Sequence, residues 1–417
     1  MKYRILALWI AFVWLLPASL PVCAQQQVTF RFAGDLMQHS TQFKAALQSD
    51  GTYSYDTSYA FIRSHFREAD WTVINMETVF DGPPYSGYPL FSSPNSLATD
   101  TYRAGANVFL TANNHIVDRG LRGVQRTLAL YDSLGVAHTG TTADAQRAPG
   151  PLLLERNGIR VALINAAYSL NGNRLPSGVQ VGRLDSASIC SQIHLARIAL
   201  ADFIICCVHW GNEYQMNAST AQRTMARALK RYGADAVIGS HPHVPQGIEV
   251  ACDTMGTVTF LTAFSLGNFL SNQPDPESRM GLLLGFTLVK TGGTTRMVRP
   301  FYEWVWTWKP VVNGKRTYYA VPVSDPRLYR TVMQPAADTL EMVRTLHSLR
   351  TFMQTAAPQL NERKRTPCYE RKNLYFGEYP SLRPLWTEQP FDALIGPSFP
   401  AIENRSPRRG NQSPGRP

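Results

Sequence analysis

The chain has 417 residues, of which 44% are hydrophobic and 17% charged, and its formal net charge is +11. This composition is typical of a globular protein with one large or two ordinary domains, and it excludes a chain that is disordered throughout. The basic balance suits either an anionic partner or a solvated charged surface. Since no basic stretch is interleaved with aromatic residues, we predict no nucleic-acid partner.

Residues 1–24 have the features of a secretory signal peptide. Two basic residues precede an apolar run at residues 5–16, and small residues follow, with the natural cleavage point after Ala24. The run is short for a stable membrane span. We therefore expect an exported protein, either periplasmic or associated with the cell envelope. Lipid attachment at Cys23 is the less favoured alternative because the residue before it is bulky.

Residues 28–290 alternate between short apolar runs and longer amphipathic runs. Val28, Phe30 and Phe32 recur with the period of a strand. Strands are expected at residues 28–34, 71–77, 107–115, 159–168, 202–211, 234–240, 257–269 and 281–290, and helices at 58–69, 121–135 and 219–233. The last helix has Ser219 and Gln222 at capping-box spacing. The alternation predicts an α/β domain built on a parallel sheet, which we place at residues 25–290.

The pattern weakens beyond this domain. Residues 301–323 are rich in aromatic residues and predict a hairpin with its turn at Asn313-Gly314. Residues 331–354 have the character of one helix. We group the hairpin and the helix as an extension, residues 291–360. A basic tail, residues 361–417, follows and ends in a segment of low apolar content that we expect to be partly disordered.

Five cysteines remain after the expected cleavage, and their spacing is not typical of a metal site. Cys206 and Cys207 are adjacent inside an apolar strand run, so we expect them to be buried. A bridge between Cys190 and Cys252 is compatible with an oxidising compartment, but the sequence does not establish it.

Side chains with metal-ligand chemistry follow the apolar runs repeatedly. The set comprises Asp35, Glu77, Asn113, Asn114, His115, His209, His241 and His243. Because parallel strands point the same way, their carboxyl ends meet at one edge, where ligands bind in such folds. Mixed nitrogen and oxygen ligands suit Mn, Zn or Fe, and the set is large enough for one or two ions. Pro242 alone separates two of the histidines, and we expect an extended backbone that aims both rings to one side.

Each candidate also has a structural alternative. Asp35 could cap a helix, Asn114 could occupy a turn, and His115 could be a hydrogen-bonded core histidine. Glu77 could equally be an acid at the start of a helix. We interpret Asp118 as the cap of the helix that begins near residue 121.

Six segments in order, "FAGDLM", "NMETVF", "LTANNHIVDRG", "VHWGNEY", "GADAVIGSHPHVPQGIE" and "SLGNF", resemble the CapA family, which is named for capsule and poly-γ-glutamate synthesis. That family is similar to a branch of the calcineurin-type metallophosphoesterase superfamily. The resemblance covers about residues 28–290. It implies a four-layer α/β/β/α sandwich and a role in capsule or cell-wall polymer biosynthesis, alone or with other synthesis proteins. It implies a metal-dependent hydrolase or transferase acting on an anionic polymer or its precursor. The alternative is a non-catalytic accessory protein that binds or guides the polymer.

The resemblance also implies roles for single residues. Asp35 would bind one metal, Glu77 would bridge, and Asn114 and His209 would bind a second metal. His241 and His243 would divide between the metals. His115 would act as general acid, with Glu213 as a further catalytic-site candidate. The implied substrate contacts are His39, Asn113, Gln246 and Asn268.

The chain departs from the superfamily in one place. Where the superfamily has Asp-x-His, this chain has Asp35-Leu36-Met37. One metal therefore lacks an expected imidazole, and His39 could replace it only if the backbone loops back. Whether one ion or two bind is left open by the sequence.

Overall fold

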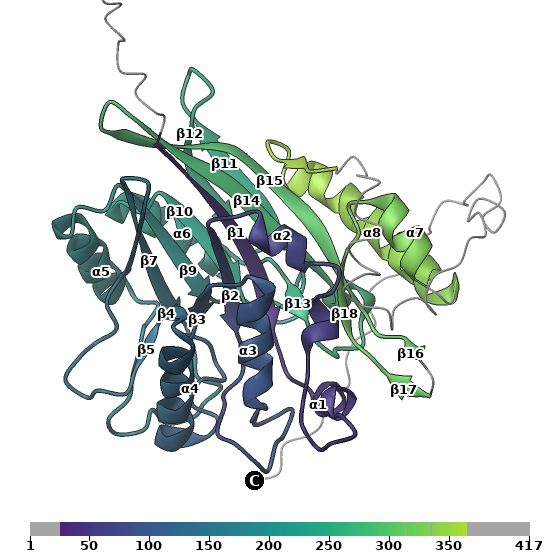
Figure 1. Cartoon of the computed structure of the whole chain (residues 1–417). Helices are drawn as coiled ribbons and strands as arrows, with labels where there is room; N and C mark the ends of the chain where they lie inside the picture. The colour runs from purple at the N-terminus through teal and green to yellow at the C-terminus, as the bar shows by residue number, and fades with distance from the viewer. Residues whose placement is uncertain (1–25, 313, 334–335, 365–417) are drawn as a thin grey trace, which may run out of the picture.

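The computed structural model describes residues 26–312, 314–333 and 336–364 (Figure 1). The predicted signal peptide with Cys23, the residue Asn313, and most of the predicted tail lie outside the described residues. Within the described part, no helix combines the length and the apolar character that a membrane crossing requires.

A large mixed sheet forms the centre of the molecule. Its strands run in the order β4 (Ala137–Thr139), β3 (Val108–Leu110), β2 (Trp71–Met76), β1 (Gln26–Leu36), β14 (Met280–Thr291), β15 (Thr294–Trp308), β12 (Val258–Ala263), β10 (Ala236–Ser240), β9 (Phe203–His209), β7 (Ile159–Ala167) and β6 (Leu152–Arg156). Strands β1 to β4 are parallel, and so are β7, β9, β10 and β12. Strands β14 and β15 are antiparallel to their neighbours, so the two parallel halves are joined by an antiparallel pair that the sequence pattern did not predict.

The two parallel halves of this sheet pack face to face, which confirms the four-layer prediction. Alternate residues of each strand point to opposite faces. In β9, Ile205 and Cys207 enter the core between the halves, whereas Ile204 and Cys206 pack under α5 (Ser186–Ile198) and α6 (Thr220–Tyr232). Figure 1 shows these helices outside β7, β9 and β10, away from β1 and β14. Burying each large apolar side chain in such layers contributes about 1.5–3 kcal/mol.

A second helical layer covers the other half of the sheet. It consists of α1 (Ser40–Ala46), α2 (Arg63–Arg67), α3 (Asn95–Ala104) and α4 (Gly120–Leu134), with a 3₁₀ turn at Asp56–Tyr59. The helix predicted at 58–69 is wrong in extent, because the chain makes the 3₁₀ turn and then the short α2. Residues 59–62 are all buried, which one face of a continuous helix does not allow. The sequence pattern did not predict α1, α3 or α5.

The predicted helix ends at α4 and α6 are confirmed. Helix α6 starts with the Ser219–Gln222 capping box, and its cap Gly233 has φ 105°. Helix α4 stops at Gly135, whose φ is 66°. Because L-residues with a side chain rarely adopt positive φ, glycine ends both helices at low cost.

The segment after residue 290 is paired with the central sheet. Strand β15 pairs along β14, and β18 (Tyr319–Pro322) pairs with β15. The predicted aromatic hairpin is present, with β16 (Val311–Val312) paired to β17 (Lys315–Arg316), while Asn313 of its predicted turn lies outside the described residues. The domain boundary at residue 290 stays a prediction.

Helices α7 (Pro326–Val332) and α8 (Ala336–Ala356) take the place of the single helix predicted at 331–354. Met342, Leu346 and Leu349 of α8 join the core between the sheet halves. The remaining short elements are β5 (Thr141–Thr142), β8 (Gln180–Val181), β11 (Ile248–Cys252), β13 (Asn268–Leu270), β19 (Asn361–Glu362) and a 3₁₀ turn at Pro276–Arg279.

The cysteines of the described residues are unbridged. Cys206 and Cys207 are buried, as predicted, whereas Cys190 and Cys252 are exposed free thiols. The structure therefore contains no Cys190–Cys252 bridge.

Candidate metal centre

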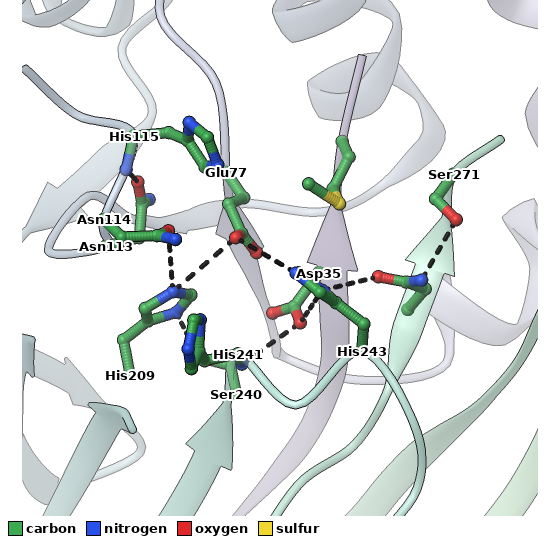
Figure 2. A network of polar contacts seen from close by, with 12 residues as sticks. Asp35, Glu77, Asn113, Asn114, His115, His209, Ser240, His241, His243 and Ser271 are labelled. Atoms are coloured by element: carbon green, nitrogen blue, oxygen red, sulfur yellow. Dashed lines mark hydrogen bonds and ion pairs between the residues drawn. The ribbon is translucent and has the colours of Figure 1, made fainter. Parts of the chain in front are cut away.

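Side chains from both halves of the sheet meet at the carboxyl ends of the parallel strands (Figure 2). Asp35 lies near the end of β1, and Glu77 directly follows β2. His209 ends β9, and His241 and His243 follow β10. Asn113, Asn114 and His115 come from the segment after β3. The centre thus lies between the two halves, where strands distant in sequence bring their ends together.

Among the described residues, three overlapping groups of side chains have ligand atoms within 4.8 Å of one another. They are Glu77 with His209 and His241, Asp35 with Glu77 and His243, and Glu213 with His241 and His243. Glu77 belongs to two groups, as a bridging carboxylate would. His241 and His243 each belong to two groups. Glu213 is exposed, whereas the other members are buried.

The interatomic distances are close to the spacing of atoms around an ion, with two of the four slightly longer than that spacing. His209 Nε2 lies 2.9 Å from Asn114 Oδ1 and 3.6 Å from Glu77 Oε1. His243 Nδ1 lies 3.1 Å from Asp35 Oδ2, and His243 Nε2 lies 3.8 Å from Glu77 Oε1. Ligand atoms about 2.0–2.2 Å from one ion are about 3–3.5 Å from one another.

Two buried atoms of this cluster lack a hydrogen-bond partner within the described part of the chain. They are Glu77 Oε1 and His241 Nδ1. A buried carboxylate oxygen without a partner is costly, and native proteins usually pair such groups or place them on a metal. Both atoms are donors to divalent cations, so the residues present fit a metal ion.

The electrostatics of the cluster also fit a cation. Burial raises the pKa of Glu77 well above its ordinary value, and the nearby charge of Asp35 raises it further. Burial lowers the pKa of His209 well below its ordinary value and that of His241 to about 4, and neighbouring histidines add to both effects. The two imidazoles are therefore neutral at neutral pH, which is the form that binds metal.

The backbone around the two histidines differs from the expected extended form. His241 has φ 98° and His243 has φ 60°, both in the left-handed region. Such conformations cost of order 1–3 kcal/mol each and persist where surrounding contacts hold them. Here the His241 amide donates to Asp35 Oδ2 at 3.1 Å, and the Tyr214 amide donates to the Pro242 carbonyl at 2.8 Å. The rings reach the same centre through this turn, with centroids 5.8 Å apart.

His115 is paired with Asp118 beside the cluster. Its Nδ1 lies 2.8 Å from Asp118 Oδ2, which also accepts the Phe91 amide at 2.8 Å. The interpretation of Asp118 as a helix cap is wrong, because the N-cap of α4 is Arg119 and no side chain caps that end. Asp118 instead orients the His115 ring, and the Phe91 ring packs edge-on against it at 4.5 Å.

The residues predicted to contact substrate are hydrogen-bonded within the wall of the site. Asn268 Oδ1 lies 3.1 Å from His243 Nδ1. The side-chain Nδ2 of Asn113 donates to the Met76 carbonyl at 2.9 Å. The side-chain oxygen of Gln246 accepts a hydrogen bond from Gln222 Nε2, and its Nε2 donates to the Gln215 carbonyl. Their roles toward a substrate stay predictions.

His39 does not take the place of the missing imidazole. It is the N-cap of α1, where it forms a capping box with Gln42. It belongs to none of the three groups found among the described residues. Burial lowers its pKa to about 4. At the position of the missing imidazole, Met37 places its sulfur 3.9 Å from Gln273 Nε2.

Residues of the site that were not predicted from the sequence include Asn75, Tyr168 and Asn171. Asn75 donates to Asp35 Oδ1 at 2.8 Å and to Glu77 Oε2 at 3.3 Å. The sequence feature that could have identified Asn75 is its position as a polar residue inside the apolar run 71–77. Tyr168 and Asn171 follow β7 and contact His241, Asn114 and His115. Tyr168 could have been found as one more polar residue at a strand end.

Comparison with known proteins connects this geometry to a family. Residues 29–273 match the family model described as "Bacterial capsule synthesis protein PGA_cap". The chain is 26% identical over 305 residues to "PGA biosynthesis protein CapA" of Bacillus subtilis (strain 168), covering 69% of this chain and 76% of that protein. It is 27% identical over 216 residues to "Capsule biosynthesis protein CapA" of Bacillus anthracis, covering 51% of each chain.

Solved structures with some similarity include the NAD nucleotidase NadN of Haemophilus influenzae, with a TM-score of 0.44 and 9% identity over 86% of this chain and 60% of that one. Another is the calcineurin-like phosphoesterase YfkN of Bacillus subtilis, with a TM-score of 0.40 and 15% identity over 79% of this chain and 99% of that one. The family match covers more than half of the sequence, and the chain therefore belongs to the bacterial capsule synthesis protein family described as PGA_cap.

Proposed function

We propose that this family member is an exported, metal-dependent hydrolase or transferase that acts on an anionic cell-envelope polymer or its precursor, with poly-γ-glutamate as the first candidate. The observation that carries the proposal is the buried donor set around Glu77. Its carboxylate lies between two groups of imidazole and oxygen donors, and one of its oxygens has no hydrogen-bond partner in the described structure.

The donor set would hold one or two ions, which we propose to be Mn, Zn or Fe. Glu77, His209 and His241 would hold one ion with Asn114, and Asp35, Glu77 and His243 would hold the other. When bound, a divalent ion of this kind supplies Lewis-acid polarisation of a phosphoryl or acyl oxygen. Asn75 donates hydrogen bonds to both carboxylates and keeps their orientation.

His115 is placed to move a proton. Asp118 engages its Nδ1, and Nε2, which lies 3.5 Å from Asn171 Nδ2, is the ring atom that can face a reacting group. A general acid held in this way donates its proton to the leaving group of the substrate. The edge of Phe91 packs against the ring and limits its rotation.

A cavity of about 450 Å³ lies beside the centre and offers space for the substrate. Tyr168 lines this cavity, and its hydroxyl lies 3.0 Å from His241 Nε2. Arg183 also lines it and is paired with Asp185 at 3.2 Å. The net charge of +11 supports an anionic polymer, since the protein's field attracts such a partner. The features of residues 1–24 support export.

The test is metal analysis of the purified full chain, combined with assays on phosphoester and γ-glutamyl substrates. We expect stoichiometric Mn, Zn or Fe and a turnover that is lost in His241→Ala. A chain without metal and without any His241-dependent turnover would contradict the proposal.

The second candidate function is a non-catalytic accessory protein that binds or guides the polymer. The observation that favours it is Met37, which stands where the superfamily supplies an imidazole. Polymer binding that persists in both His209→Ala and His241→Ala, in a chain without turnover, would establish this alternative instead.

A further inference from the structure

The segment after β7, residues 168–173, lines the cavity beside the metal centre and also contacts the centre itself. In the β7–β9 ladder, Ala167 pairs with His209, and the Tyr168 amide donates to the His209 carbonyl at 3.0 Å. The segment therefore starts beside a candidate ligand. Leu170, Gly172 and Asn173 line the cavity.

Asn171 is the residue of this segment that contacts the side chains of both Asn114 and His115. Its Oδ1 accepts a hydrogen bond from Asn114 Nδ2 at 3.0 Å, and its Nδ2 lies 3.5 Å from His115 Nε2. The backbone at Asn171 has φ 53°, and its amide donates to Ser169 Oγ at 3.1 Å. Asparagine tolerates this left-handed conformation better than most residues, which suits the turn.

The contact with Asn114 decides which end of the Asn114 amide faces the centre. A side-chain amide binds a cation through its oxygen, whereas its NH₂ group is only a donor. Asn171 accepts the Nδ2 hydrogen, and Asn114 Oδ1 then faces His209 Nε2 at 2.9 Å, as the dashed line in Figure 2 shows. The reversed amide would present NH₂ to the donor set and would leave two acceptor oxygens, on Asn114 and Asn171, facing each other.

We propose that Asn171 is a positioning residue of the metal centre, which holds the Asn114 oxygen toward the ion. The inference rests on the proposed function in one respect, that the centre binds a divalent ion. It does not require that the protein turns over a substrate. Partners of this kind, one step away from the metal, change metal affinity by about 10–100-fold when they are removed.

The test compares Mn²⁺ binding in three variants of the full chain. Asn171→Gly removes the side chain and keeps a residue that accepts positive φ, so the turn is retained. Asn171→Asp keeps an acceptor oxygen for Asn114. Asn157→Gly is the matched control, because Asn157 also has a left-handed backbone, with φ 52°, and lies in the turn before β7 at the opposite end of that strand.

We expect Asn171→Gly to weaken Mn²⁺ binding about 10–100-fold, measured by electron paramagnetic resonance of the free ion, and to reduce the rise in Tm that Mn²⁺ produces. Asn171→Asp should bind Mn²⁺ about as tightly as the unmodified chain, and so should Asn157→Gly. The inference is overturned if Asn171→Gly binds as tightly as Asn157→Gly, or if Asn171→Asp is as weak as Asn171→Gly.

The same measurements separate this inference from the proposed function. An unmodified chain that binds Mn²⁺ but shows no turnover contradicts the catalytic proposal and leaves the comparison of variants decisive. An unmodified chain that takes up none of Mn²⁺, Zn²⁺ and Fe²⁺ overturns both.

Discussion

His115 Nδ1 lies 2.8 Å from Asp118 Oδ2, and both side chains are almost completely buried beside the candidate metal centre. A carboxylate in this position holds the imidazole in one tautomer and one orientation. Asp118 does not belong to any of the three groups of candidate ligands in the described structure. Proton transfer and metal binding can therefore be separated by substitution.

Asp118→Asn is expected to lower kcat by about 10- to 100-fold, because His115 loses the carboxylate that orients it as a general acid. Metal content should stay that of the unmodified chain. Steady-state kinetics on the substrate that proves active, with metal analysis of the same sample, check this. A variant that loses its metal would show that Asp118 supports the ligands instead.

Glu77→Gln is expected to raise the stability of the metal-free protein and to reduce the stabilisation that a bound metal gives. Burial raises the pKa of Glu77, which shows that its charged form is disfavoured without a cation. The neutral amide should therefore make the metal-free protein more stable by about 1–3 kcal/mol. Thermal unfolding with EDTA should show this gain.

The same variant should lose the rise in Tm that Mn²⁺ gives to the unmodified chain, because the shared carboxylate is gone. An undiminished Mn²⁺ effect in Glu77→Gln would argue against Glu77 as a ligand.

Gly34→Ala is expected to disrupt the centre from outside it. A Cβ at Gly34 would lie 1.8 Å from the Gly267 carbonyl oxygen, which accepts the Asp35 amide at 3.0 Å. Because β1 is held in the sheet and Gly267 is held by its bridge to Gly281, we expect destabilisation of about 3 kcal/mol or more and weaker metal binding. Chemical denaturation measures the loss. Gly150→Ala is the control, because a Cβ there meets no atom within 4 Å.

The four described cysteines should differ in their reactivity with iodoacetamide, two of them reacting and two not. Burial raises the pKa of Cys206 to about 12 and raises that of Cys207 well above its ordinary value. Alkylation needs the thiolate, so these two thiols should stay unmodified in the native protein even at pH 9. The exposed Cys190 and Cys252 should react. Peptide mass spectrometry distinguishes the classes, and labelling of Cys207 in the folded protein would contradict this assignment.

Much of the donor set could be predicted because it depends on local pattern. Each apolar run marks a strand, and the first ligand-type residue after it marks the strand end. Asp35, Glu77 and His209 were found in this way, and parallel pairing within each half of the sheet brings such ends together. Buried strands and glycine-ended helices were predictable for the same reason.

The tertiary structure alone decided how these residues meet. The left-handed turn at His241 and His243 is held by Asp35 and by the Tyr214 amide, which are distant in sequence. Asp118 faces His115 rather than a helix end, and Asn171 reaches Asn114 across 57 positions of the chain. The end of a strand can be recognised from the residues of that strand alone. The partners of a turn or an amide depend on how the two halves of the sheet pack, and no local pattern carries that information.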